Sequence, residues 1–142
     1  MRTIVVIVLL VAGSSQAYAK TINAEQIYAE WLQHYADRDP DAAIAMTSGD
    51  FVMVNNATVM DRAAATAFVE GLAAFILSRQ CTNTKIVLHG LPDKAQSLLE
   101  RVDCNFQTVI GPLGAHFWEQ IIVDKGGTIV YDQFSDIANP SL

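Results

Sequence analysis

Two acidic side chains in the last quarter of this 142-residue chain are well suited to moving a proton. Glu119 lies between Phe117 and Ile121 in a strand-like segment, so an inward-facing segment would bury its carboxyl group. Burial raises the pKa of a carboxyl group, and a second carboxyl nearby raises one of the two further. Asp132 faces Glu119 if the paired residue numbers of the final hairpin sum to 251. Such a pair could hold one proton and serve in turn as acid and base.

A structural role for the same carboxyl groups stays open at this point. Glu119 could accept a hydrogen bond from the hydroxyl group of Tyr28 or Tyr35, or it could face solvent. The histidines are dispersed along the chain, which favours neither a metal centre nor a nucleophile triad; they are His34, His89 and His116. We therefore expect no metal and no cofactor.

The two cysteines, Cys81 and Cys104, have the spacing of a cross-strand pair. A hairpin whose paired numbers sum to 185 sets them opposite each other and also sets Lys85 opposite Glu100, which is an independent match of charges. Directly opposed strand residues have Cα separations of about 4.5 to 5.5 Å, which a disulfide accepts. Two cysteines without companion histidines make a poor zinc site, since structural zinc needs four ligands. We predict a disulfide between Cys81 and Cys104.

The first 19 residues have the pattern of a secretory signal. Arg2 supplies the positive start, residues 4–12 are an unbroken apolar run, and Ala17-Tyr18-Ala19 matches a small-residue cleavage site. The run is too short for a permanent bilayer-spanning helix, although an uncleaved anchor is the alternative. We therefore expect a signal peptide over residues 1–19, one domain over residues 20–142, and a periplasmic or secreted mature protein without a membrane attachment.

Acidic residues outnumber basic ones, and the chain has a formal net charge of -6 at pH 7. Nucleic acids and anionic membranes attract clustered Lys and Arg, so this balance argues against both as partners. The length suffices for a single hydrophobic core.

The elements that would hold the candidate side chains follow one another in a clear order. The first helix carries an apolar face with three aromatic rings, those of Tyr28, Trp31 and Tyr35. Caps and turn residues mark the other boundaries. The expected elements are a helix after Asn23, a short helix from Asp39-Pro40, a strand over 51–54, a turn at Asn55-Asn56, a helix capped by Asp61, and hairpins over 81–104 and 117–134.

Both faces of the final hairpin are apolar. One face is expected to pack on the helices, and it carries Phe117, Ile121, Val123, Val130 and Phe134 together with Glu119. The other face carries Trp118, Ile122, Ile129 and Tyr131. An apolar outer face is typical of a subunit interface, so we expect a homodimer through the sheet.

The chain resembles the nuclear transport factor 2-like superfamily, in particular its SnoaL-like and ketosteroid isomerase-like branch. The resemblance rests on residues 31–39 (WLQHYADRD), on residues 49–55 (GDFVMVN) and on the final hairpin with its glycine turn. It implies an α+β, cone-shaped fold, in which three N-terminal helices pack on a curved, mostly antiparallel sheet. It also implies a deep pocket at the open end of the cone and frequent dimerisation through the sheet.

The isomerase site of this branch falls on three positions of the chain. The tyrosine that stabilises an oxyanion falls on Trp31, whose indole N–H donates a hydrogen bond. The proton-shuttling aspartate falls on Asn55, whose amide cannot act as a base, and this disfavours a steroid isomerase of the usual mechanism. The second oxyanion donor, a carboxylic acid kept neutral by burial, falls on Glu119.

The sequence leaves three functions open. The first is a pocket for a small, largely apolar molecule without catalysis, lined by Tyr28, Trp31, Tyr35, Asn55, Phe117 and Phe134. The second is an isomerase or dehydratase that uses Glu119 and Asp132 as proton-transfer groups. The third is a non-catalytic dimerisation or protein-interaction module that uses the outer face of the sheet.

Overall fold

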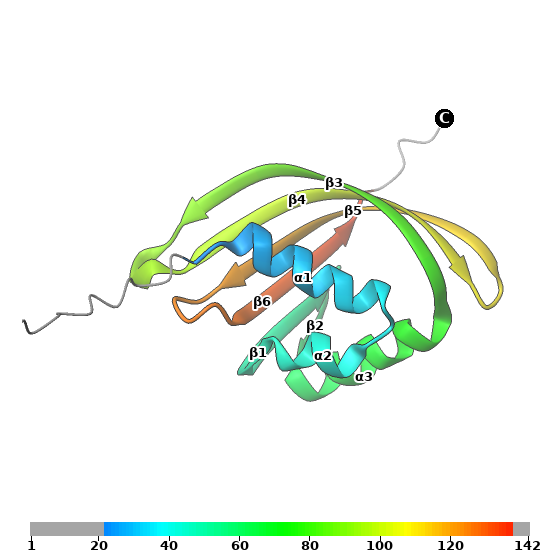
Figure 1. Cartoon of the computed structure of the whole chain (residues 1–142), viewed down its shortest axis with the longest axis horizontal. Coiled ribbons are helices and arrows are strands. Elements are labelled where there is room, and N and C mark those ends of the chain that lie inside the picture. The colour runs from blue at the N-terminus through cyan, green and yellow to red at the C-terminus, as the bar shows by residue number, and fades with distance from the viewer. Residues whose placement is uncertain (1–21, 138–142) are drawn as a thin grey trace, which may run out of the picture.

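The computed structural model describes residues 22–137, in which one curved sheet wraps around three helices (Figure 1). This is the predicted α+β fold. The sheet order is β2-β1-β6-β5-β4-β3, and every neighbouring pair is antiparallel except β1 and β6. The predicted signal peptide lies outside the described residues. The elements are α1 (Ala24–Ala36), α2 (Pro40–Ala45), β1 (Thr47–Asn55), β2 (Thr58–Asp61), α3 (Arg62–Phe75), β3 (Ile76–Gly90), a 3-10 turn (Pro92–Lys94), β4 (Gln96–Thr108), β5 (Gly111–Val123) and β6 (Ile129–Asp136).

Each helix begins at the residue that its sequence predicts. The side chains of Asn23, Asp39 and Asp61 accept hydrogen bonds from the backbone amides three residues further on, at 3.2, 3.0 and 2.9 Å. These bonds satisfy amides that have no partner inside the helix. The helices then bury their apolar faces against the sheet in one core, whose largest fully buried side chains include Trp31, Phe51, Met53, Leu98, Ile121 and Ile129.

The hairpin of β3 and β4 has the predicted register from Ser78 to Lys85, with Cys81 opposite Cys104 and Lys85 opposite Glu100. A β-bulge after Lys85 then sets Val87 opposite Leu99, where the predicted register gives Leu98. Both strands are longer than expected, and a further hairpin joins β4 to β5 through a tight turn that ends at Gly111. Gly111 has φ +124°, a conformation that other residues rarely adopt. Val109 and Ile110, directly before it, are apolar and exposed. The sequence there lacks the alternation of polar and apolar residues that predicts a strand.

The final hairpin differs from the predicted register. Glu119 pairs with Phe134, and Asp132 pairs with Ile121, so the two carboxyl-bearing residues are diagonal neighbours instead of direct partners. A β-bulge between Ile122 and Val123 inserts one extra residue into β6. The bulge turns Ile129 into the core, where it is fully buried, and the prediction that Val130 faces inward with Ile129 outward is therefore wrong.

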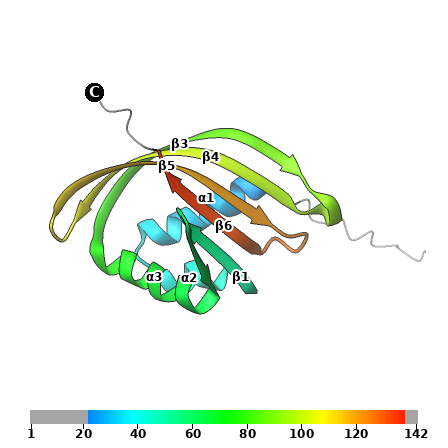
Figure 2. The ribbon, with the colours of Figure 1, turned by 180° about the vertical axis from the view of Figure 1, so that it is seen from behind.

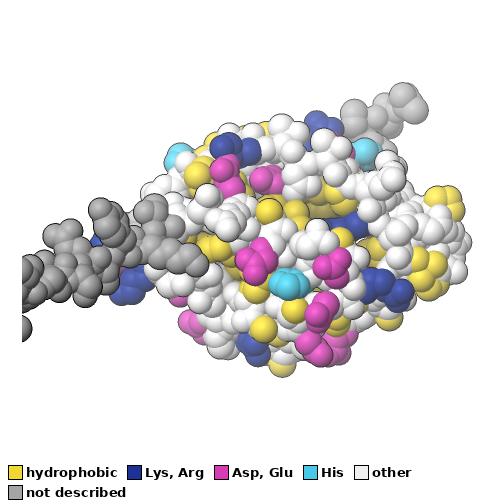
Figure 3. Space-filling view, in the orientation of Figure 1, with side chains coloured by type: hydrophobic (Ala, Val, Ile, Leu, Met, Phe, Trp, Pro, Cys, Tyr) yellow, Lys and Arg dark blue, Asp and Glu magenta, His cyan; other side chains and the backbone are white. Residues whose placement is uncertain are grey.

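Seen from the side, the long strands β3, β4 and β5 arch over α1, while α2 and α3 lie against the other end of the sheet (Figures 1 and 2). The surface is hollowed between α1 and the arch, and hydrophobic side chains are visible along this gap (Figure 3). None of the described helices is long and apolar enough to cross a membrane.

Candidate functional site

Two buried carboxyl groups lie next to each other on the concave face of the sheet. Glu119 of β5 is 8% exposed and Asp132 of β6 is 1% exposed. Side chains that occupy diagonal positions on one face of an antiparallel pair lie within reach of each other. One oxygen of Asp132, Oδ1, has no hydrogen-bond partner among the described residues. The acidity of both groups reflects a side-chain hydrogen bond within the pair, so Asp132 has Glu119 as its polar neighbour in this site.

Burial is the main cause of the altered acidity of this pair. It raises the pKa of Glu119 from 4.5 to about 7, although the hydrogen bond from Tyr28 and the charge of Arg79 act in the opposite direction. Burial also raises the pKa of Asp132 well above its usual value, and the neighbouring Glu119 raises it further. Like charges in a desolvated site disfavour joint ionisation, so near neutral pH the pair retains a proton.

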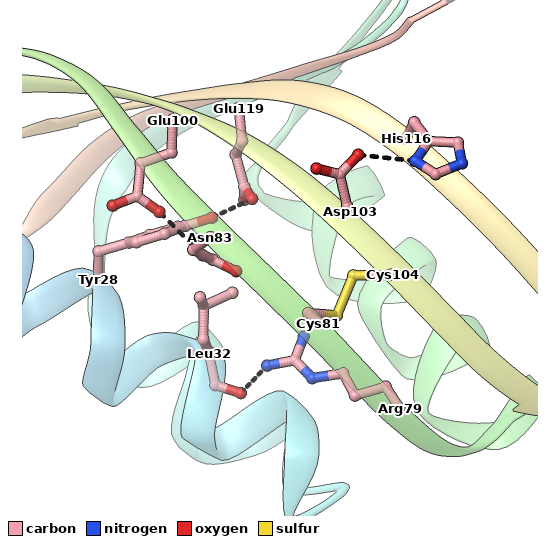
Figure 4. The surroundings of a disulfide bond; sticks show 10 residues. All are labelled: Tyr28, Leu32, Arg79, Cys81, Asn83, Glu100, Asp103, Cys104, His116 and Glu119. Carbon is pink, nitrogen blue, oxygen red and sulfur yellow. Dashed lines mark hydrogen bonds and ion pairs between the residues drawn. A yellow bond between two sulfur atoms is a disulfide. The ribbon is translucent and has the colours of Figure 1, made fainter. Parts of the chain in front are cut away.

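Tyr28 fixes the position of the Glu119 carboxyl group. Its hydroxyl group donates a hydrogen bond to Oε2 of Glu119 from the buried face of α1 (Figure 4). The structural alternative that the sequence left open is thus realised for Tyr28, and it coexists with the strong perturbation of the carboxyl group. Burial, and then the adjacent carboxylate, raise the pKa of Tyr28 well above its usual value, so the phenol stays protonated as a donor.

The carboxyl pair forms part of the wall of an inner cavity of about 90 Å³ between the helices and the sheet. A cavity of this size suits a small molecule. The rest of the wall is mostly apolar, apart from Arg79 and the hydroxyl group of Tyr35. The lining residues are Leu32, Tyr35, Met53, Phe68, Leu72, Ile76, Arg79, Phe106, Glu119, Asp132 and Phe134.

The six residues predicted to contact a ligand fall into two groups. Tyr35 and Phe134 line the inner cavity, and Tyr28 lines an adjoining groove. The other three lie outside the cavity wall. Trp31 packs in the core against Tyr35 and Phe51, Phe117 packs edge-on against Phe134, and Asn55 ends β1 at the turn into β2.

A groove of about 370 Å³ runs between α1 and β3, beside the inner cavity. Arg79 and Leu32 line both spaces, and the guanidinium group of Arg79 donates a hydrogen bond to the carbonyl oxygen of Leu32 (Figure 4). Further along the groove, Asn83 donates a 2.8 Å hydrogen bond to Glu100. Sequence reasoning missed Arg79, although its position two residues before Cys81 puts it on the same face of β3.

The predicted disulfide between Cys81 and Cys104 is present, and it joins β3 to β4 beside Arg79 (Figure 4). His116 lies on the outer face of the sheet, where its Nδ1 is 2.7 Å from Asp103. Within residues 22–137, no three side chains of the metal-binding kinds come together.

Comparison with solved structures identifies the fold. One similar structure is AusH from Aspergillus nidulans, with a TM-score of 0.66 and 10% identity over 81% of this chain and 84% of that one. The pinacolase BvnE from Penicillium brevicompactum has a TM-score of 0.65 and 12% identity over 80% of this chain and 87% of that one. The epoxide hydrolase/cyclase-like enzyme SalBIII of salinomycin pyran-ring formation has a TM-score of 0.64 and 14% identity over 81% of this chain and 91% of that one. Searches against family models and curated proteins gave no match. The chain thus has the nuclear transport factor 2-like fold that was predicted, and at these identities the likeness concerns the fold alone.

Proposed function

We propose that this protein binds a small, largely apolar molecule in the inner cavity and that Glu119 and Asp132 move a proton on it. The reaction class would be an isomerisation or a dehydration. The observation that carries the proposal is the pair of adjacent buried carboxyl groups in an otherwise largely apolar wall. Apolar walls with a few convergent polar groups are typical of small-molecule sites.

The two carboxyl groups suit opposite tasks. Burial and the neighbouring Glu119 raise the pKa of Asp132 well above its usual value, so Asp132 suits the role of proton or hydrogen-bond donor to a developing oxyanion. Glu119, with a pKa of about 7, is ionised often enough to accept a proton from carbon and is a strong enough acid to return it. The hydroxyl group of Tyr35 lines the same cavity and can act as a second donor to the substrate.

Two fold neighbours offer an analogy for this chemistry. The structures named a pinacolase and an epoxide hydrolase/cyclase-like enzyme indicate that this architecture can host reactions on carbon skeletons. Because one fold hosts many unrelated functions, the proposal rests on the carboxyl pair and not on these names.

The test is the exchange of the α-protons of cyclohexanone for deuterium, followed by NMR in D₂O. Isomerisation and dehydration both require proton transfer of this kind, and the ring has about the size of the cavity. We expect exchange with the wild-type protein and a loss of about a hundredfold or more in Glu119→Gln, since general base catalysis contributes factors of about 10² to 10⁴. Glu70→Gln, the same change on the exposed side of α3, is the matched control and should leave the rate unaltered.

The outcomes separate the candidate functions. Exchange that persists unchanged in both Glu119→Gln and Asp132→Asn would end the catalytic assignment. Binding of cyclohexanone without exchange, detected as a raised melting temperature, would leave a ligand-binding domain as the function.

We also propose that the protein is exported, with residues 1–19 as its cleaved signal. Support comes from the Cys81–Cys104 disulfide, because disulfides persist in oxidising compartments. Fractionation of cells that make the full-length chain would test this, with the N-terminal residue read by mass spectrometry. An N-terminus at Lys20 in the periplasm or medium is expected, and an uncleaved cytosolic product would contradict it.

The outer face of the sheet favours a second role, association with another copy of the chain. Trp118 is 38% exposed there, and the partly exposed side chains of Ile122 and Tyr131 lie further along the same face, beyond Gln120. Large exposed aromatic residues are typical centres of protein interfaces. Light scattering should give a dimer for the wild-type protein and a monomer for Trp118→Asp, and a monomeric wild-type protein would exclude the proposal.

A further inference from the structure

Arg79 stands at the boundary between the inner cavity and the groove along α1. Its side chain lines both spaces, and so does Leu32. A molecule held against the carboxyl pair in the inner cavity therefore reaches the groove by passing the guanidinium group. A ligand that extends from the inner cavity toward the groove therefore places atoms beside Arg79 and Leu32.

The guanidinium group of Arg79 makes little use of its hydrogen-bonding capacity. It has five N–H donors, and the side chain's one hydrogen bond within the described residues goes to the carbonyl oxygen of Leu32. That oxygen lies inside α1, where the amide of Ala36 is its regular helical partner, so it does not need a second donor. The plane of the guanidinium group also approaches the ring of Tyr35, with 5.9 Å from Cζ to the ring centroid.

The other charged groups of the groove already have partners. Glu25 forms an ion pair with Lys85, and Glu100 accepts the hydrogen bond from Asn83. No carboxylate of the described residues lies within 4.0 Å of the Arg79 guanidinium nitrogens. The charge of Glu119 acts on Arg79 without forming a direct ion pair. The guanidinium donors therefore stay open to a bidentate carboxylate, the group whose geometry matches them best.

We propose that the natural ligand is a small organic acid, whose apolar body fills the inner cavity and whose carboxylate binds Arg79 at the boundary with the groove. This inference rests on the proposed function and adds the chemical class of the ligand. It explains why a cation lines a largely apolar cavity. It also gives the ligand one orientation, because the carboxylate end is held at Arg79 while the carbon skeleton faces Glu119 and Asp132.

The experiment compares benzoate with benzamide, which have the same shape but differ in charge. Binding is measured by NMR titration at pH 6, below the raised pKa of Glu119, so that its carboxylate competes less for Arg79. We expect the wild-type protein to bind benzoate about ten to a hundred times more tightly than benzamide, as hydrogen bonds to charged groups allow. In Arg79→Gln the preference should fall to about twofold, while the affinity for benzamide stays within about threefold of the wild-type value.

Arg101→Gln is the matched control, because Arg101 is exposed on β4 and paired with Asp103 away from the groove. This variant should retain the full preference for benzoate, and urea unfolding should confirm that both variants are folded. Equal affinity of the wild-type protein for the two compounds would overturn the inference and leave a ligand site for neutral molecules. An equal loss of affinity for both compounds in Arg79→Gln would also overturn it. So would a loss of the benzoate preference in Arg101→Gln as large as that in Arg79→Gln. If neither compound binds the wild-type protein, both the inference and the proposed ligand site fail.

Discussion

Replacing Glu119 with glutamine should stabilise the folded protein at alkaline pH, although it removes the candidate base. Burial raises the pKa of this carboxyl group from 4.5 to about 7, so the folded state holds the proton more tightly than the unfolded state. Below about pH 4.5 both states are protonated and the group adds no cost. Between about pH 4.5 and pH 7 the unfolded state ionises while the folded state keeps its proton, and the free energy of unfolding falls by about 3 kcal/mol, at about 1.4 kcal/mol for each pH unit. Above pH 7 both states are ionised and the cost stays at this level. Ionisation of Asp132 also lowers the free energy of unfolding as the pH rises, because its pKa is raised as well.

The measurement is urea unfolding at pH 4 and pH 8, followed through the fluorescence of the buried Trp31. Glutamine retains an oxygen that can accept the hydrogen bond from Tyr28, so the packing is preserved. Glu119→Gln should exceed the wild-type protein by about 3 kcal/mol at pH 8 and by little at pH 4. The control Glu70→Gln, on the exposed side of α3, should change the free energy of unfolding by less than about 0.5 kcal/mol at both values.

One result would refute this reasoning. If Glu119→Gln were no more stable than the wild-type protein at pH 8, the carboxylate would be solvated, or stabilised by Arg79 and Tyr28 as fully as by water. The buried acid–base pair would then lose its physical basis. If the free energy of unfolding of Glu119→Gln were lower than that of the wild-type protein by the same amount at both pH values, the lost contact with Tyr28 would instead be the main cause of the change in stability.

Three further predictions concern the scaffold. Replacing Cys81 and Cys104 with serine should lower the free energy of unfolding by about 3 kcal/mol, as expected for a loop of this size, since the disulfide joins residues separated by 23 positions; an unchanged urea midpoint would contradict a stabilising role. Asp61→Ala should lower the free energy of unfolding by about 1 kcal/mol, because the helix cap is missing, whereas Asp61→Asn should keep most of the stability that the cap provides. Equal losses of stability in thermal melts of the two variants would argue against capping. Ile129→Ala should cost about 2 to 5 kcal/mol and Val130→Ala much less, because the bulge turns Ile129 into the core; the reverse order in urea unfolding would refute the register.

Features of the fold that depend on local contacts could be predicted from the sequence. Three residues cap helices through hydrogen bonds from amides three residues away: Asn23, Asp39 and Asp61. The start of each helix can therefore be predicted from a few consecutive residues. The extension of β4 and β5 could not be predicted in this way. Its turn at Gly111 is flanked by exposed apolar residues, and the strands there are held by pairing across the hairpin instead of by burial of one face.

The candidate site was predicted in part, and for a reason that the register makes clear. The turn is one residue longer than predicted and the bulge near Val130 adds one more, so the partner of Glu119 shifts from Asp132 to Phe134, which is a slip of two residues. Because strand side chains alternate with a period of two, this slip keeps Asp132 on the same face as Glu119, whereas a slip of one would have separated them. Arg79 escaped prediction because its significance depends on two cavities that meet only in the folded chain.

The carboxyl pair is difficult to explain as a device for stability. Two apolar side chains at positions 119 and 132 would fill the same space without desolvating ionisable groups, and such replacements are often neutral or stabilising. The hydrogen bond from Tyr28 satisfies Glu119 but leaves Oδ1 of Asp132 without a partner in the described chain. An unsatisfied buried oxygen beside a cavity lowers stability and confers no packing advantage. A bound molecule that meets this oxygen would supply the missing partner, which is why the proposed proton transfer is placed in the inner cavity.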